Sequence, residues 1–157
     1  MFERTLHLNL IVSDFGRAHR FYTDVLGLEE VKTFEIGGRD FERGVGIENS
    51  QARVAHLKLP GGAVVLEISE YVEGKAIAVA GDRKANEPGF RHVALRVNDI
   101  VTSYEELSKK GVRFISEPVT VTRPESLKGF KFCYFYDPDG NIWELNQRPE
   151  TVDYRDC

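Results

Sequence analysis

Residues 136–145 read Tyr136-Asp137-Pro138-Asp139-Gly140-Asn141-Ile142-Trp143-Glu144-Leu145, and the rest of the chain can be interpreted from this stretch. Proline presets φ in a turn and glycine accepts a positive φ, so residues 137–140 predict a tight turn between two strands. Side chains alternate along the second strand, which places Trp143 and Leu145 on one face and Glu144 on the other. A carboxylate on a half-buried face is unfavourable unless it has a cation or hydrogen-bond donors nearby. We therefore expect partners for Glu144 elsewhere in the chain.

Length and charge limit the classes of protein that this chain can represent. Its 157 residues suffice for one domain or two small repeated halves, and 41% hydrophobic with 29% charged residues is typical of a globular fold. A net charge of −4 argues against a nucleic-acid partner, because no basic run is long enough to neutralise several phosphates. No apolar run approaches the roughly 20 residues that cross a bilayer. The only cysteines, Cys133 and Cys157, are too few for a disulfide framework, so we expect a cytoplasmic protein. We also expect that its partner is a small molecule and not a membrane.

The first half of the chain predicts one strand, one helix and three further strands. Polar and apolar residues alternate over residues 5–12, and Asp14 is suited to cap a helix that Gly27 ends. Pro60-Gly61-Gly62 predicts the turn of a hairpin between the last two strands. The three further strands are predicted at residues 30–36, 53–59 and 63–69.

The same order of elements returns in the second half. Residues 89–99 alternate, Asn98 or Asp99 is suited to cap a helix, and Gly111 ends it. Further strands are predicted at residues 113–116, 131–136 and 142–147. We interpret the chain as an internal repeat of two modules, about residues 5–72 and 90–148, with a connector at 73–89 and a C-terminal tail at 149–157.

Four predicted strands each carry one histidine or glutamate that is out of phase with their apolar residues, namely His7, Glu67, His92 and Glu144. A single such residue is more often a hydrogen-bonded structural residue than a metal ligand. Here the repeat doubles the pattern, and equivalent positions in two related modules are expected to converge. Two imidazoles and two carboxylates suit one divalent ion such as Zn²⁺, Ni²⁺, Co²⁺, Mn²⁺ or Fe²⁺.

Other candidates have simpler structural interpretations. His56 lies on a predicted strand and is a candidate to line a cavity. Cys133 and Tyr134 are most simply core residues, because no base stands beside the cysteine in the sequence. The glycines at residues 37–46 do not predict a phosphate loop, since no strand-to-helix context surrounds them.

Three stretches of the sequence resemble the vicinal oxygen chelate superfamily, which contains glyoxalase I, bleomycin resistance proteins and extradiol dioxygenases. They are residues 7–14 followed by Phe21-Tyr22-Thr23-Asp24-Val25-Leu26-Gly27-Leu28, then residues 92–99, then residues 137–145. The resemblance covers nearly the whole chain. It implies an α+β fold with two paired βαβββ modules in a single domain, forming an eight-stranded, U-shaped, barrel-like mixed sheet around a metal cavity. It also implies a homodimer.

The resemblance further implies a ligand set and a type of chemistry. The metal ligands correspond to His7, Glu67, His92 and Glu144. Four protein ligands match glyoxalase I, whereas extradiol dioxygenases use three. Two open positions on an octahedral ion would bind vicinal oxygens of a substrate and stabilise an enediolate. We therefore expect a metal-dependent lyase or isomerase, with Glu144 as general base and Glu67 as the group that returns the proton.

Residues around the expected ligands bear on the substrate. Asn9 and Arg96 share the ligand face of their strands and are candidates to orient substrate oxygens. Ile11 and Tyr71 stand where glyoxalase I places an arginine and an asparagine for glutathione, which argues against glutathione use. The alternatives to a lyase or isomerase are an Fe²⁺ extradiol dioxygenase and a metal-free drug-binding protein of the bleomycin resistance type.

Overall fold

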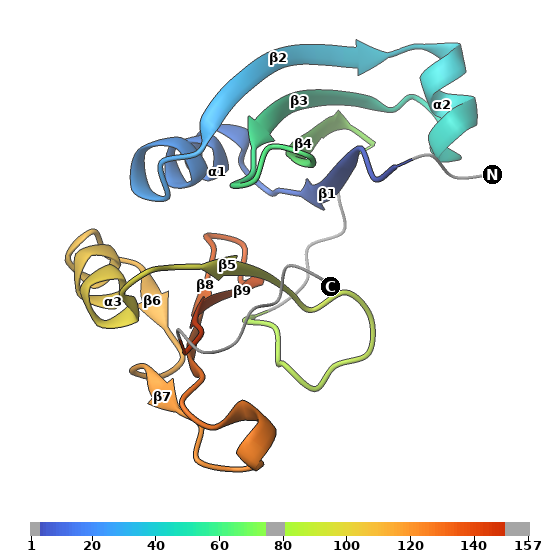
Figure 1. Cartoon of the computed structure of the whole chain (residues 1–157). Coiled ribbons are helices and arrows are strands. Elements are labelled where there is room, and N and C mark those ends of the chain that lie inside the picture. Colours follow the sequence, from blue (N-terminus) through green and yellow to red (C-terminus); the bar gives the residue numbers. More distant parts are fainter. Residues whose placement is uncertain (1–3, 75–80, 150–157) are drawn as a thin grey trace. The chain divides into compact units, whose positions relative to one another are not determined.

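The computed structural model describes residues 4–74 and 81–149. It divides the chain into two compact units, Met1–Ala80 and Gly81–Cys157. The predicted α+β fold is confirmed, with a mixed four-stranded sheet in the first unit and a mixed five-stranded sheet in the second (Figure 1). Parts of the predicted connector (75–80) and of the predicted tail (150–157) lie outside the described residues. No helix in the described ranges is long and apolar enough to cross a bilayer.

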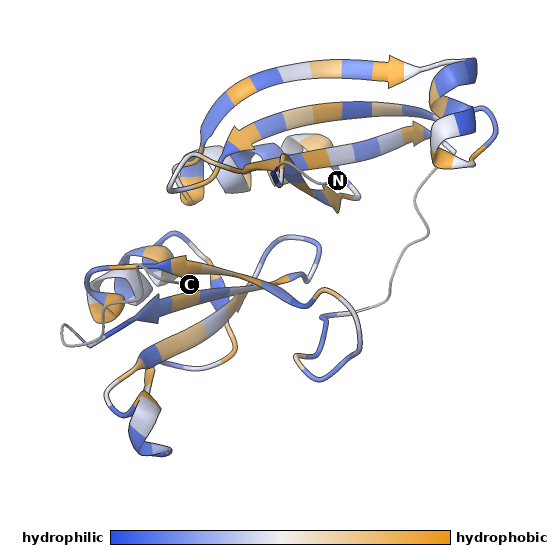
Figure 2. Cartoon of the chain, turned by 45° about the vertical axis from the view of Figure 1, so that its right-hand side comes forward, coloured by the Kyte–Doolittle hydropathy of each residue, from blue (hydrophilic) through white to orange (hydrophobic). Residues whose placement is uncertain are grey.

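The described part of the first unit, residues 4–74, contains four strands. Its elements in chain order are β1 (His7–Ile11), α1 (Phe15–Arg20), a π-helical turn (Phe21–Val25), β2 (Glu29–Gly37), α2 (Arg39–Val45), β3 (Gln51–Lys58) and β4 (Val65–Glu73). The strands lie in the order β1-β4-β3-β2, and β1 is parallel to β4. Hydrophilic and hydrophobic residues alternate along the strands of this sheet (Figure 2), which gives it one face for α1 and one polar face.

Helix α1 begins where the sequence predicts. Asp14 Oδ1 accepts a hydrogen bond from the backbone N–H of Arg17 at 2.8 Å, and Gly27 ends the helical segment with φ 75°. Helix α1 contacts β4. The buried side chains of α1, the π-helical turn and β4 include Phe15, Ala18, Tyr22, Leu66 and Ile68.

Helix α2 is not predicted by the sequence analysis. It follows β2 directly through Gly38, which has φ 85°, so the interpretation that no strand-to-helix context surrounds these glycines is wrong. The helix has seven residues and carries Asp40 and Glu42 in its first turn. Two negative charges at a helix N-terminus disfavour a bound phosphate, so the conclusion that this is not a phosphate loop is unchanged.

The second unit repeats the order of the first with one additional strand. Its elements are β5 (His92–Arg96), α3 (Ile100–Lys109), β6 (Arg113–Phe114), β7 (Val119–Thr120), a 3₁₀ turn (Glu125–Leu127), β8 (Lys131–Tyr136) and β9 (Ile142–Gln147). Strand β7 pairs with β8 and accounts for nine described strands instead of the expected eight. The predicted cap of α3 is Asp99, whose Oδ1 accepts from the backbone N–H groups of Val101 and Thr102. The bonds from Thr102 and Val101 hold the pKa of Asp99 below its usual value.

Strand β9 is more buried than the sequence predicts. Residues 142–146 are all buried, and Trp143 is 1% and Glu144 7% exposed. The expectation of a half-buried strand is wrong because β9 lies between β5 and β8 in the sheet. Phe135 of β8 also stacks on Trp143, with ring centroids 6.4 Å apart.

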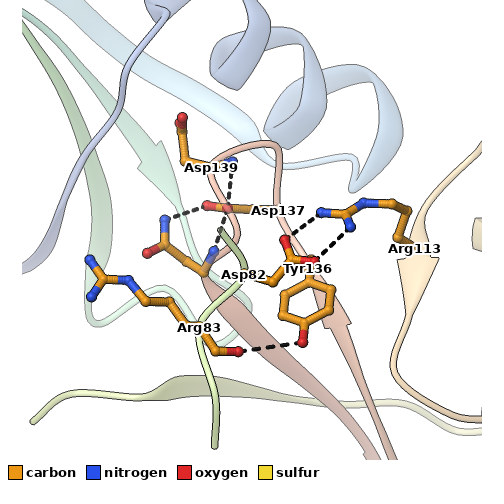
Figure 3. A network of polar contacts seen from close by, with 7 residues as sticks. Asp82, Arg83, Arg113, Tyr136, Asp137 and Asp139 are labelled. Carbon is orange, nitrogen blue, oxygen red and sulfur yellow. Dashed lines mark hydrogen bonds and ion pairs between the residues drawn. The ribbon is translucent and has the colours of Figure 1, made fainter. Parts of the chain in front are cut away.

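The turn before β9 is organised by a buried aspartate (Figure 3). Asp137 is 2% exposed, and its Oδ1 accepts from the backbone N–H groups of Asp139 at 2.9 Å and Asn141 at 2.8 Å. Its Oδ2 accepts from Asn141 Nδ2 at 2.8 Å. Gly140 has φ 77°, and a Cβ there would lie 3.1 Å from the Cα of Asp82. The turn is therefore closed from inside by a carboxylate and leaves no room for a side chain at Gly140.

A second set of contacts attaches residues 82–83 to this turn. Arg113 donates two hydrogen bonds of 2.8 Å to the carboxylate of Asp82 (Figure 3). The backbone N–H of Arg83 donates to Gly140 O at 3.1 Å, and the Tyr136 hydroxyl donates to Arg83 O at 3.4 Å. The guanidinium of Arg113 holds the pKa of Asp82 below its usual value. The chain entering the second unit is thus fixed to the turn that starts β9.

We predict that Asp137→Ala lowers the free energy of unfolding by roughly 1–3 kcal/mol, because it leaves partly buried donors without an acceptor. Asp137→Asn keeps one carbonyl oxygen and should fall between the variant and the wild type. Urea unfolding followed by tryptophan fluorescence measures the effect, since Trp143 lies in the adjoining strand. An alanine variant with an unchanged midpoint would show that the turn does not need this carboxylate.

Candidate functional site

The first unit brings together two of the predicted ligands. Strands β1 and β4 are parallel, and their register puts Asn9 opposite Glu67, so His7 stands two residues before that position. The two side chains therefore lie diagonally on one face of the sheet, with His7 Nε2 3.9 Å from Glu67 Oε1. The His7 side chain is 44% and the Glu67 side chain 18% exposed, so this face is open to solvent on the histidine side.

The second unit brings together the other two ligands in the same way. Strands β5 and β9 are parallel, Ala94 lies opposite Glu144, and His92 again stands two residues earlier. His92 Nε2 lies 3.2 Å from Glu144 Oε2, with the two side chains 37% and 9% exposed. The repeat therefore extends from the order of elements to the register that pairs each histidine with its glutamate.

Hydrogen-bond donors hold both carboxylates. Asn9 Nδ2 donates to Glu67 Oε1 at 2.8 Å and also contacts Ser69 Oγ at 2.8 Å. His56 Nε2 lies 2.5 Å from Glu67 Oε2. In the second unit Asn146 Nδ2 donates to Glu144 Oε1 at 3.2 Å. Asn9 thus contacts a carboxylate that was predicted to be a ligand, in addition to its candidate role toward substrate.

Two aromatic residues beside the glutamates receive no specific partner in the sequence analysis. Strand β3 places His56 opposite Glu67, and strand β8 places Tyr134 opposite Glu144. The Tyr134 ring is 5.2 Å from that of His92, and burial followed by the charge of Glu144 raises the pKa of Tyr134. Both neighbours could have been found from the turns. Residues at equal distances from the centre of a hairpin face each other, which follows directly from the Gly61-Gly62 and Asp139 positions.

The geometry of the second pair fits adjacent ligands of one ion, whereas the first pair is wider than that spacing. Metal bonds of about 2.1 Å to nitrogen and oxygen place neighbouring ligand atoms about 3.0–3.5 Å apart. The observed separations are 3.2 Å in the second unit and 3.9 Å in the first. Within the described ranges no group of three or more His, Cys, Asp or Glu residues is arranged to hold a metal. Each unit therefore brings together two of the four predicted ligands, and the complete set stays a prediction.

Comparison with known proteins shows the family of this chain. The family model of the Glyoxalase/Bleomycin resistance protein/Dioxygenase superfamily matches residues 4–145. The chain belongs to this superfamily. It is 30% identical over 152 residues to a 2-epi-5-epi-valiolone epimerase from an Actinomyces species, covering 91% of this chain and 78% of that protein.

Two further proteins are similar to this chain over most of its length. A probable lactoylglutathione lyase from Synechocystis is 26% identical over 94% of this chain and 98% of its own length. The crystal structure of a glyoxalase family protein from Bacillus cereus aligns with a TM-score of 0.81 at 21% identity, over 94% of this chain and 95% of that one. The epimerase and the lyase are members of a family that contains both kinds of enzyme. The crystal structure shows the glyoxalase fold.

Cys133 lies beside the second pair but is a core residue. It is 0% exposed on β8, and burial, followed by the charge of Glu144, raises its pKa to about 11. The prediction that it belongs to the core is confirmed. A thiol with this pKa contains almost no thiolate near neutral pH, so it is not a nucleophile.

We predict that Cys133 reacts with iodoacetamide at pH 8 about 100-fold more slowly in the folded protein than in guanidinium, because raising the pKa by about two units reduces the thiolate about 100-fold. The Cys157→Ser background leaves Cys133 as the only thiol. The same shift means that the buried thiol stabilises the fold below about pH 9 and that this contribution is lost as the pH rises toward 11. Equal labelling rates in the two states would contradict the burial of this side chain.

Proposed function

We propose that this protein is a metal-dependent lyase or isomerase of the glyoxalase type that acts on a small substrate with oxygens on neighbouring carbons. The observation that carries the proposal is the pair of His–Glu arrangements, His7 with Glu67 and His92 with Glu144, in the same register in both units. Two imidazole and two carboxylate ligands suit one Zn²⁺, Ni²⁺, Co²⁺, Mn²⁺ or Fe²⁺ ion. When bound, such an ion stabilises negative charge on substrate oxygens.

The carboxylates supply the proton-transfer groups in this proposal. Glu144 is 7% exposed and accepts a hydrogen bond from Asn146 on Oε1, while its Oε2 faces His92. In this proposal Glu144 removes the proton from the carbon beside the carbonyl. Glu67, which belongs to the first unit, returns the proton to the substrate. Arg96 stays a candidate to orient a substrate oxygen.

A substrate other than the glutathione adduct is favoured by two residues on the polar face of the first sheet. Ile11 is 43% exposed and apolar. Tyr71 stacks on Phe41 with ring centroids 6.0 Å apart. Neither side chain has a charged or amide group for a peptide ligand, and the epimerase among the relatives is consistent with a different substrate. The homodimer and the cytoplasmic location stay predictions.

We predict that metal-free protein binds one Co²⁺ or Ni²⁺ ion per chain in isothermal titration calorimetry, and that His7→Ala and His92→Ala each weaken binding by about 10-fold or more, because each removes one of four ligands. His19→Ala is the matched control, since His19 pairs with Glu30 outside the proposed ligand set. If the wild-type protein takes up none of the five candidate ions, the lyase or isomerase and the dioxygenase are both excluded. The metal-free drug-binding protein is then the remaining alternative.

We also predict that the metal-loaded protein exchanges the proton beside the carbonyl of its substrate with solvent deuterium. A panel of small hydroxyketones and 2-oxo acids, followed by ¹H NMR, tests this. Glu144→Gln should reduce exchange by about 100- to 10,000-fold with the ion still bound, because the amide can coordinate but cannot accept the proton. Oxygen consumption with catechols and no deuterium exchange would instead support the dioxygenase.

A further inference from the structure

The side chain of His56 is bonded to one of the two proposed carboxylate ligands. Its Nε2 lies 2.5 Å from Glu67 Oε2, on the neighbouring strand β4. An ionised carboxylate has no proton to donate, so the imidazole N–H donates. The two side chains are 17% and 18% exposed, and a charge-assisted hydrogen bond that is partly screened from water is stronger than one on an open surface.

The imidazole of His56 is itself held in place. The ring of Phe34, from the adjacent strand β2, meets it edge-on with centroids 5.4 Å apart and an interplanar angle of 81°. The ring of His7 also lies near it, with centroids 6.1 Å apart. The donor that contacts Glu67 is therefore a ring packed against two other rings.

The bond to Oε2 leaves the other carboxylate oxygen facing the histidine ligand. Oε1 is the oxygen nearest His7 Nε2, at 3.9 Å, and it also accepts from Asn9. A carboxylate oxygen has two lone pairs, so Oε1 can keep the bond from Asn9 and still bind an ion. The orientation of Glu67 is thus fixed at both oxygens before an ion arrives.

The second unit lacks this arrangement at the equivalent position. Tyr134 stands opposite Glu144 as His56 stands opposite Glu67, but in the described part of the chain no hydrogen bond joins Tyr134 to Glu144. Glu144 is held on Oε1 by Asn146, and its Oε2 contacts the proposed ligand His92. The repeat therefore contains an internal control: the strand next to the glutamate supplies a hydrogen-bond partner opposite it in the first unit and none in the described second unit.

We propose that His56 is a positioning residue that holds Glu67 in the orientation for metal binding, and that Tyr134 has no such role toward Glu144. This inference rests on the proposed function, since it assigns a role to His56 through a proposed metal ligand. Hydrogen bonds to ligating carboxylates orient them, and removing such a partner typically lowers metal affinity about 10- to 100-fold.

The test compares His56→Phe with Tyr134→Phe in the full-length protein, each titrated with Co²⁺ by calorimetry and by visible absorption. His56→Phe keeps the ring and removes the donor, and we expect it to weaken Co²⁺ binding by about 10- to 100-fold. We expect Tyr134→Phe to change the affinity less than about threefold. His56→Gln places an amide donor within reach of the carboxylate and should recover most of the lost affinity, which a purely structural role would not explain.

The possible results separate this inference from the proposed function. If the wild-type protein binds one ion and His56→Phe binds it with equal affinity, the role of His56 is overturned and the proposed metal site is unaffected. Wild-type protein that binds no ion would overturn both. Circular dichroism monitors folding, and if His56→Phe unfolds, His56→Asn replaces it, because its shorter amide does not reach Glu67 and should bind Co²⁺ more weakly than His56→Gln.

Discussion

The candidate site depends on one constraint, the parallel register between the first and last strands of each unit. A parallel pair cannot be joined by a tight turn, so the helix and the middle strands must form the connection. In both units the register sets the histidine two residues before the position opposite the glutamate, which leaves the side chains 3.9 and 3.2 Å apart on one face. A shift of one residue would turn the glutamate to the opposite face and separate the pair. The turn around Asp137 prevents such a shift in the second unit, because its bonds determine where β9 starts.

The same register places charges where burial is unfavourable, and the two units compensate for this differently. An ionised carboxylate that leaves water needs donors or a cation. Glu67 has Asn9 and His56 on its two oxygens, whereas Glu144, which is more buried, has Asn146 on one oxygen and His92 against the other. The backbone register is the same in the two units, but the polar residues next to the two glutamates differ. The difference between His56 and Tyr134 therefore gives two equivalent carboxylates different hydrogen-bond partners.

Much of the fold follows from local sequence signals. Strands β8 and β9 have the predicted bounds of 131–136 and 142–147, and Asp14 and Asp99 cap the predicted helices. Each of these signals lies within a few residues of the structure it determines. Helix α2 and strand β7 could not be predicted, because neither has a repeating apolar pattern and β7 has two residues. The burial of β9 on both faces also depends on its central place in the sheet, which no local pattern contains. The sequence pattern alone predicts only that His56 lines a cavity, although the hairpin centred on Gly61-Gly62 already places it opposite Glu67.

Each unit contains half of the proposed ligand set. Zinc sites in proteins use three or four protein ligands, and each unit here supplies one histidine and one glutamate. Half of the proposed set is too few to hold an ion against water, so neither unit alone would have the proposed activity. The proposed metal binding therefore depends on the repeat, because the second copy of the pattern supplies the other half of the ligand set.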